Sequence, residues 1–377
     1  MVVQLNNTIK TMKILVTGSN GFIGKHMTKA LLKDGYEVLA YDLDKTEEDL
    51  KAYIKEADFV VHLAGINRPL TSQEFYDGNS NFTKKLVDFL KIYGKNIPII
   101  MSSSIQAELD NDYGKSKKMG EDYLFESGLP VYVFRLANVF GKWCKPNYNS
   151  AAATFMYNIA HDLPIEIRDP EYIVRYNYID DIVNTFIECI KGKIPPTNQL
   201  LSIGPVYKCK LGKLASLLRE FKGAVESDEH LPKINSPFEY KLFVSFLDYL
   251  KDDSYSYNYA EDERGSFEEI YKNEKYGQIS VNKAFPGILK GGHYHTYKNE
   301  IFMTVEGDCV TRIRKIGTNK IDEYPQKGSD SVKVKITPYH THDIRNVGLI
   351  TSSTLMWISE PYSDKTPDTF REDVDIK

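Results

Sequence analysis

Cysteine is scarce and irregularly placed in this chain. The four cysteines among 377 residues are Cys144, Cys189, Cys209 and Cys309, and none belongs to a Cys-x-x-Cys pair. This spacing argues against a disulfide framework and favours reduced thiols. We therefore expect a cytoplasmic protein.

Long apolar runs are also missing. No stretch approaches the roughly eighteen consecutive apolar residues that a membrane helix requires. Residues 1–11 lack the apolar core of a signal peptide. These two absences predict no membrane insertion.

Positive charge is not in excess. The formal net charge is -4, and the sequence contains no repeat and no low-complexity tract. A chain without a basic field is not expected to bind nucleic acid. The expected partners are small molecules.

The first part of the chain alternates short apolar runs with longer amphipathic segments. The runs cover residues 14–17, 37–41, 59–63, 97–101 and 131–134, and each interval is long enough for a helix. This alternation is typical of βαβ units, so we predict an α/β fold with a Rossmann-like, doubly wound parallel sheet.

The pattern changes after about residue 235. Residues 236–250 predict one connecting helix, and the following strands are short and broken by Gly, Asn, Asp and Pro. A chain of this length is expected to hold two domains. We place the α/β domain at residues 12–250 and an all-β barrel at residues 251–377.

A glycine-rich turn joins the first predicted strand to the first predicted helix. In Thr17-Gly-Ser-Asn-Gly-Phe-Ile-Gly24, Gly18 permits a tight turn, Gly21 lets the backbone approach a pyrophosphate, and Gly24 allows close packing of helix and strand. The helix N-terminus attracts the phosphate charge. The predicted dinucleotide site of this turn includes Gly18, Asn20, Gly21, Phe22, Ile23 and Gly24.

An acidic residue ends the second strand and bears on the choice of cofactor. A carboxylate at Asp42 accepts hydrogen bonds from the adenosine ribose and repels a 2′-phosphate, which favours NADH over NADPH. Lys45 lies close enough in sequence to offset that repulsion.

A serine cluster and a Tyr-x-x-x-Lys pair follow. Ser104 ends the fourth strand, and Tyr113 and Lys117 are four residues apart, so they share one face of a helix. Lys117 is predicted to hold the cofactor ribose and to lower the pKa of Tyr113, which then exchanges a proton with a substrate oxygen. Ser104, or its neighbour Ser103, binds the same oxygen. The alternative is a solvated surface pair.

These motifs resemble the extended short-chain dehydrogenase/reductases, which act on sugar nucleotides. The glycine triad, His62-Leu-Ala-Gly65, Ser104 and Tyr113-x-x-x-Lys117 carry the resemblance. It implies catalysis by Ser104, Tyr113 and Lys117. It also implies cofactor contacts from Leu63, Ala64 and Gly65, with substrate contacts from Asn138 and Arg175. The dehydratases of this group carry Asp-Glu after the catalytic Ser/Thr, where this chain has Ile105-Gln106, so a reductase or an epimerase is favoured.

Two imidazoles and a carboxylate are closely spaced in the second part. His293 and His295 project from the same face of a strand, and Glu300 follows a tight turn. His342 on a later strand is the candidate fourth ligand. Three imidazoles and a carboxylate suit zinc or another divalent first-row metal better than calcium. The alternative is a glycine-rich corner with surface histidines.

The spacing from Gly287 through these ligands to Gly307 resembles the first cupin motif. The second cupin motif is partial, because Thr337-Pro-Tyr339 replaces its Pro-x-Gly, so His342 is the least secure ligand. Arg264 lies in a segment that resembles the entry strand of sugar-nucleotide cupins. It is expected to contact phosphate or sugar, although a structural turn is an equal alternative.

Both halves together resemble the CapF-type bifunctional capsule enzymes. The resemblance implies a UDP-linked 4-keto-6-deoxy amino sugar as substrate, C3 epimerisation in the cupin and C4 reduction in the first domain. The implied product is UDP-2-acetamido-2,6-dideoxy-L-talose, used to make N-acetyl-L-fucosamine. The family implies NADPH, whereas Asp42 favours NADH, and a homodimer is expected. Two rivals remain, a barrel that only binds or dimerises, and a 4-epimerase that retains NAD.

Overall fold

The computed structural model describes residues 11–226, 232–250, 258–363 and 365–376. The chain forms two compact units. The first contains residues 1–219 and 234–250, and the second contains residues 220–233 and 251–377. Each unit is described by itself.

A six-stranded parallel sheet forms the centre of the first unit. Its order is β2 (Glu37–Tyr41), β1 (Lys13–Thr17), β3 (Phe59–His62), β4 (Ile99–Ser104), β5 (Val131–Leu136) and β8 (Leu200–Leu201). Helices cover both faces of the sheet, so neither face is exposed to solvent. The strands are therefore apolar along their length and do not alternate between apolar and polar residues. The strand order reverses between β1 and β3, and such switch points are where open α/β sheets bind ligands.

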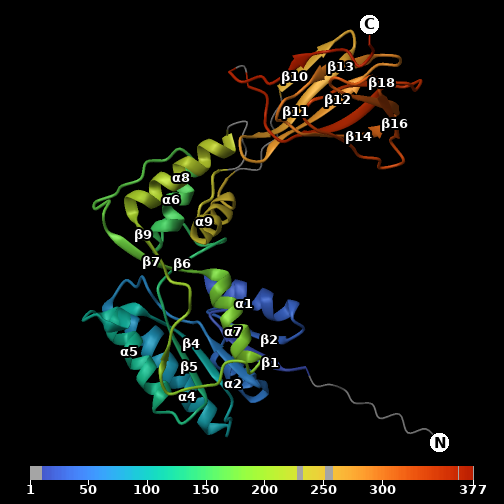
Figure 1. Cartoon of the computed structure of the whole chain (residues 1–377). Coiled ribbons are helices and arrows are strands. Elements are labelled where there is room, and N and C mark those ends of the chain that lie inside the picture. Colours follow the sequence, from blue (N-terminus) through green and yellow to red (C-terminus); the bar gives the residue numbers. More distant parts are fainter. Residues whose placement is uncertain (1–10, 227–231, 251–257, 364, 377) are drawn as a thin grey trace, which may run out of the picture. The chain divides into compact units, whose positions relative to one another are not determined.

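Helices cover both faces of this sheet (Figure 1). The helices α1 (Phe22–Lys33) and α7 (Ile179–Ile190) pack together. The helices α4 (Phe82–Ile92) and α5 (Asp112–Phe125) also pack together, and α2 (Glu47–Glu56) contacts α4. A short helix, α3 (Ser72–Phe75), and a π-helical turn, η1 (Tyr76–Asn81), precede α4, while a 3-10 turn, η2 (Ile105–Glu108), precedes α5. The core between sheet and helices is aliphatic and includes Leu15, Val60, Leu86, Leu90 and Val133.

A small three-stranded sheet completes the first unit. Strand β7 (Ile173–Tyr178) pairs in parallel with β6 (Asn138–Phe140) and antiparallel with β9 (Tyr207–Lys210). The helices of this part are α6 (Ala151–Ala160), α9 (Pro237–Leu247) and the first half of α8 (Leu211–Glu226), whose residues after 219 are assigned to the second unit. The helix α9 falls within the predicted connecting helix and begins at Ser236, whose side chain accepts a hydrogen bond from the Glu239 amide.

The second unit is all-β and antiparallel. One sheet has the order β10 (Asn258–Asp262), β11 (Gly265–Asn273), β12 (Gly277–Ala284), β19 (Ser352–Ile358), β14 (Glu300–Glu306) and β17 (Val334–Ile336). The other has the order β16 (Ile321–Lys327), β15 (Asp308–Lys315), β18 (His340–Asn346), β13 (Leu289–Tyr294) and β20 (Phe370–Arg371). An apolar cluster that includes Phe302, Ile313, Val334 and Ile344 draws on strands of both sheets.

The predicted fold class is therefore confirmed. A Rossmann-like parallel sheet precedes an antiparallel all-β region, as the alternation of runs and then the short broken strands indicated. Within the described residues, every helix is too short or too polar to cross a lipid bilayer.

Candidate active sites

The glycine-rich turn lies at the switch point of the parallel sheet. Gly18 has a φ of 71°, and a Cβ there would lie 2.7 Å from the amide nitrogen of Ala64. A Cβ at Gly24 would lie 2.0 Å from the oxygen of Gly18. Neither position has room for a side chain. The turn leads directly into α1, whose first amides are available to an anion.

Asp42 is fixed against this turn by two backbone amides. Its carboxylate accepts hydrogen bonds from the amides of Asn20 (2.7 Å) and Leu43 (2.8 Å). The structure therefore brings together Asn20 and Asp42, two of the predicted cofactor residues. Lys45 forms an ion pair with Asp44 at 3.4 Å, so part of its charge is already balanced.

The segment after β3 approaches the same place. The amide of Leu63 donates to the oxygen of Thr17 at 3.0 Å, and the Ala64 amide lies 3.4 Å from the Thr17 hydroxyl. A Cβ at Gly65 would lie 2.8 Å from Nζ of Lys117. The predicted cofactor residues of β1, β3 and α5 are thus neighbours.

Lys117 is almost completely buried. Its side chain is 6% exposed, and its ammonium group donates to the oxygen of Ser102 at 3.4 Å. Burial lowers the pKa of Lys117 to about 8, although the nearby Glu121 opposes the shift. Lys117 therefore carries its charge at neutral pH but holds it at a cost.

The pKa of Tyr113 is opposite in direction to the prediction. Burial raises it, and a hydrogen bond from Ser104 only partly offsets that effect. The expected lowering of this pKa is therefore wrong for the protein without cofactor, because loss of water around the phenol outweighs the Ser104 hydrogen bond. A raised pKa keeps the phenol protonated, which suits a proton donor.

Ser103 does not join Ser104 and Tyr113. It is buried and donates a hydrogen bond to Glu121, and Glu121 also accepts two hydrogen bonds from Arg135, at 2.9 and 2.7 Å. The structure thus places Ser103 in an ionic network that ties α5 to β4 and β5. Of the two serines considered, Ser104 alone reaches the phenol.

Two predicted substrate residues lie on neighbouring strands of the small sheet. The Asn138 side chain donates to the backbone oxygen of Arg175 at 3.1 Å. Both side chains are exposed, so both are accessible to a ligand.

One buried polar residue at this site was missed by the sequence reasoning. Asn79, in the π-helical turn η1, accepts from the Ile66 amide at 2.9 Å and donates to the Ile66 oxygen and the Ser116 hydroxyl, both at 3.0 Å. Its side-chain oxygen would lie 2.8 Å from a Cβ at Gly65. The π-helical turn breaks the usual helical period, so the periodic pattern carried no signal for Asn79.

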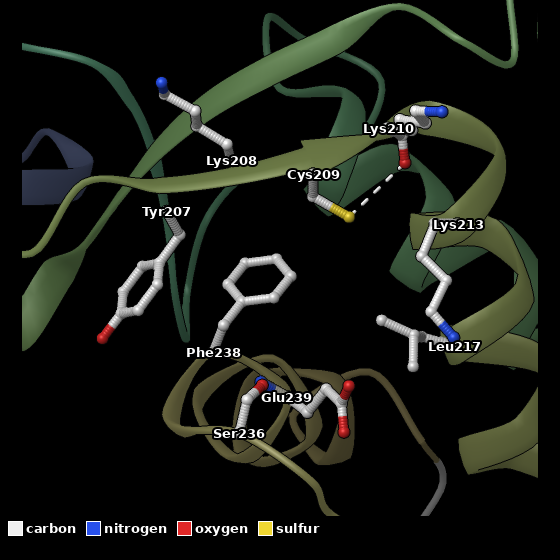
Figure 2. A pocket seen from close by; sticks show the side chains of 9 residues that line it. All are labelled: Tyr207, Lys208, Cys209, Lys210, Lys213, Leu217, Ser236, Phe238 and Glu239. Atoms are coloured by element: carbon white, nitrogen blue, oxygen red, sulfur yellow. Dashed lines mark hydrogen bonds between the residues drawn. The ribbon is translucent and has the colours of Figure 1, made fainter.

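A separate cavity of about 400 Å³ lies between β9, α8 and α9 (Figure 2). Figure 2 shows the ring of Phe238 pointing into it, opposite Lys213 and Leu217. None of the predicted site residues is among the residues that line it, which are Tyr207, Lys208, Cys209, Lys210, Lys213, Leu217, Ser236, Phe238 and Glu239.

The four predicted metal ligands meet in the second unit. One ligand atom from each of His293, His295, Glu300 and His342 lies within 4.8 Å of all the others. His293 and His342 face each other across the pairing of β13 with β18, while Glu300 begins β14 in the other sheet. Both sheets therefore contribute ligands.

The polar atoms at the centre of this cluster have no hydrogen-bond partners. Among the described residues, Nε2 of His295, Nε2 of His342 and Oε2 of Glu300 are buried and unsatisfied. The Glu300 oxygen lies 2.8 Å from the His342 nitrogen and 3.4 Å from the His295 nitrogen. Lone pairs aimed at one another repel, and a shared cation removes that cost. The donor set therefore fits a divalent metal.

The Nδ1 atoms of His295 and His342 contact backbone oxygens. Nδ1 of His295 donates to the oxygen of Asp368, and Nδ1 of His342 donates to the oxygen of His340 at 3.2 Å. Such contacts fix the tautomer and direct Nε2 towards a metal. Nδ1 of His340 instead contacts the oxygen of Pro338 at 2.9 Å, and His340 is not part of the cluster.

The pKa shifts differ among the members of the cluster: burial acts to lower the pKa of His295, but its contacts with Glu300 and Asp368 raise it overall. Burial lowers the pKa of His293 to about 4, and His342 acts in the same direction, so His293 is neutral near pH 7. Burial alone would raise the pKa of Glu300, but interactions with His342 and His295 bring it below its usual value. Neutral imidazole and ionised carboxylate are the forms that bind metals.

The turn before His342 adopts a left-handed backbone without glycine. Tyr339 has a φ of 59°, in the left-handed region that glycine usually occupies, and its amide donates to the oxygen of His295 at 2.7 Å. The substitution at this turn therefore leaves His342 in place.

Arg264 is engaged within its own turn. Its amide and guanidinium both bind Asp262, with an ion pair at 2.5 Å, between β10 and β11. The side chain is exposed. The structural alternative for this residue thus has direct support, and a substrate contact stays a prediction.

Comparisons with known proteins cover both units. Residues 14–192 match the NAD dependent epimerase/dehydratase family, and residues 260–370 match the polysaccharide biosynthesis C-terminal domain. A UDP-2-acetamido-2,6-beta-L-arabino-hexul-4-ose reductase of Pseudomonas aeruginosa is 39% identical over 366 residues, covering 95% of this chain and 98% of that protein. The crystal structure of capsular polysaccharide assembling protein CapF from Staphylococcus aureus is 40% identical with a TM-score of 0.88, covering 96% of this chain and 100% of CapF. The chain belongs to the CapF-type family.

A more distant likeness concerns the fold alone. A UDP-glucuronic acid 4-epimerase from Bacillus cereus, solved in complex with NAD, has a TM-score of 0.54 and is 21% identical, covering 63% of this chain and 98% of that chain. As a CapF-type protein, the chain is an oxidoreductase, and the match over residues 14–192 supports a nicotinamide cofactor.

Proposed function

We propose that the chain reduces the C4 ketone of a UDP-linked 4-keto-6-deoxy amino sugar in its first unit and epimerises C3 of that sugar in its second. Two observations support the reductase: Tyr113 is hydrogen-bonded to Ser104, and Lys117, on the same helix, approaches Gly65 in the segment after β3. The P. aeruginosa relative, named as a reductase of such a 4-ulose, supports the substrate.

In the reduction, Tyr113 supplies a proton and Ser104 orients the ketone. The raised pKa of Tyr113 means that the phenol enters the reaction protonated. The Lys117 ammonium, four residues along the same helix, would stabilise the phenolate that remains after proton transfer. A bound reduced nicotinamide would supply the hydride to C4. Asn138 and Arg175 offer an amide and a cation to the substrate diphosphate.

For the epimerisation, His293, His295, Glu300 and His342 would hold a zinc ion or another divalent metal. A bound metal would act as a Lewis acid on the C4 oxygen and so acidify the hydrogen on C3. The unsatisfied atoms at the cluster centre support this assignment. Removal and return of the C3 proton on opposite faces would then invert that carbon.

The proposed product is UDP-2-acetamido-2,6-dideoxy-L-talose, an intermediate for capsule or O-antigen N-acetyl-L-fucosamine. The resemblance to solved CapF supports a capsule role. We also propose a cytoplasmic homodimer with domains over residues 12–250 and 251–377, and either NADH or NADPH as reductant.

An incubation with the 4-keto sugar nucleotide in deuterated water tests both parts. With reduced nicotinamide, we expect NMR to show a C4 alcohol with inverted C3 and equimolar loss of cofactor. Without it, we expect deuterium at C3 and no reduction.

Two outcomes contradict parts of the proposal. Reduction without C3 exchange would make the second unit a binding or dimerisation module. Cofactor that survives purification and is not consumed would indicate a 4-epimerase that retains NAD.

A further inference from the structure

Asp368 contacts the metal cluster from a distant part of the sequence. It is 7% exposed and lies two residues before β20, which pairs with β13 so that His293 opposes Arg371. Its backbone oxygen accepts the hydrogen bond from Nδ1 of His295. One residue near the C-terminus therefore sets the orientation of a predicted ligand.

The Asp368 carboxylate also holds the turn between two predicted ligands. One oxygen accepts from the Thr296 amide at 3.0 Å and the Thr296 hydroxyl at 2.5 Å. The other lies 3.2 Å from the Tyr297 amide and 3.4 Å from the Lys298 amide. These donors lie between His295 and Glu300, so the carboxylate fixes the spacing of those ligands.

The segment that carries Asp368 is itself anchored. The Lys298 ammonium donates to the oxygen of Pro367 at 3.1 Å. Arg312 forms an ion pair with Asp375 at 2.9 Å, and Arg314 forms one with Glu372 at 2.8 Å. The chain end is thus bound to β15 on one side of Asp368 and to the ligand turn on the other.

We propose that Asp368 is a positioning residue for the metal site: its backbone oxygen orients His295, and its carboxylate clamps the turn to Glu300. The inference rests on the proposed metal site and adds a residue that is not itself a ligand. Outer partners of this kind commonly change metal affinity by about 10- to 100-fold.

The test uses full-length protein and two metals as probes. In Asp368→Asn the side chain keeps its shape, and asparagine tolerates the left-handed φ of 41° at this position. The variant presents an NH2 group to backbone amides that need an acceptor. We expect about 10- to 100-fold weaker Zn²⁺ binding in competition with a chromophoric chelator, and a changed visible absorption spectrum with Co²⁺. Asp322→Asn, which changes an exposed carboxylate of β16 that pairs with Lys320, should change neither.

A second variant protects the test against misfolding. Thr296→Val removes the hydroxyl donor and keeps the backbone donors, so it should weaken Zn²⁺ binding by a smaller factor. Unchanged Zn²⁺ affinity and Co²⁺ spectrum in both variants would overturn the positioning role. Wild-type protein that binds neither metal would instead overturn the proposed metal site, on which the role depends.

Discussion

The two sites differ in how complete they are without their ligands. In the first unit, Lys117 donates to a backbone oxygen, Ser104 bonds Tyr113, and Asn79 has both ends of its amide satisfied. In the second unit, the inward atoms of His295, His342 and Glu300 lack partners among the described residues. The side chains of the first site therefore satisfy one another, whereas those of the second leave unsatisfied atoms that the proposed cation would bind.

The same contrast separates two kinds of catalytic group. In the proposed function, the first site acts through a protonated phenol and a charged lysine that belong to the chain. The second site, as proposed, would act through a metal held by its ligand set. Loss of a catalytic side chain should therefore lower C4 reduction most, and loss of the metal should lower C3 exchange most.

The largest effect should come from Tyr113→Phe. Removing the phenol hydroxyl takes away the proton donor, and such groups contribute about 10²- to 10⁴-fold, so we expect C4 reduction to fall by about 10³-fold. C3 exchange in deuterated water should persist, because the metal ligands lie in the other unit. Stopped assays of cofactor oxidation with NMR of the sugar measure both. Equal loss of both activities would show that the sites are not separable.

Metal removal should give the next largest effect, and on the opposite activity. Chelation should reduce C3 exchange by at least about 10²-fold, because the Lewis acid is lost. It should also lower the melting temperature of the second unit, since buried unpaired groups are costly. Glu300→Gln should act in the same direction, whereas Glu306→Gln, near the end of the same strand, serves as the control. Undiminished exchange in metal-free protein would contradict the assignment.

Local spacing predicted much of both sites. His293 and His295 are two apart at the end of β13 and lie in one cluster, and Tyr113 and Lys117 are four apart on α5. The glycine turn fell between strand and helix as predicted. These features depend on neighbours in sequence, so the sequence was enough.

Long-range packing decided the rest. The choice of Ser104 over Ser103 depends on Glu121, and the direction of the Tyr113 pKa depends on burial. Asp368 reaches His295 across 73 positions of sequence. Tyr339 takes a glycine-like φ because its turn is held from both sides. No periodic pattern contains such information.

Cofactor choice should show a smaller effect, confined to the first site. Two backbone amides hold the Asp42 carboxylate where the adenosine ribose is expected. The carboxylate should therefore disfavour binding of a 2′-phosphate. We expect appreciable activity with NADH and a shift of about tenfold towards NADPH in Asp42→Ala, measured as the ratio of kcat/KM values. Asp44→Asn, which frees Lys45, should shift the ratio less. A strict requirement for NADPH in the wild type would contradict this account of Asp42.

The smallest expected effect is on stability and comes from the buried Lys117. Its folded pKa of about 8 lies below its ordinary value of 10.5, so between those values the unfolded chain holds more protons than the folded one. Stability should therefore rise as pH increases through this window, by about 1 kcal/mol between about pH 7 and 9. Lys117→Met should flatten that rise and stabilise the cofactor-free first unit near neutral pH, while reduction is lost. Calorimetry of the first-unit transition measures it, and an unchanged pH slope in the variant would show that Lys117 is not the strained group. A flattened slope would instead show that the buried Lys117 lowers the stability of the first unit. In the second unit, the corresponding loss of stability would come from the unsatisfied atoms of the metal cluster.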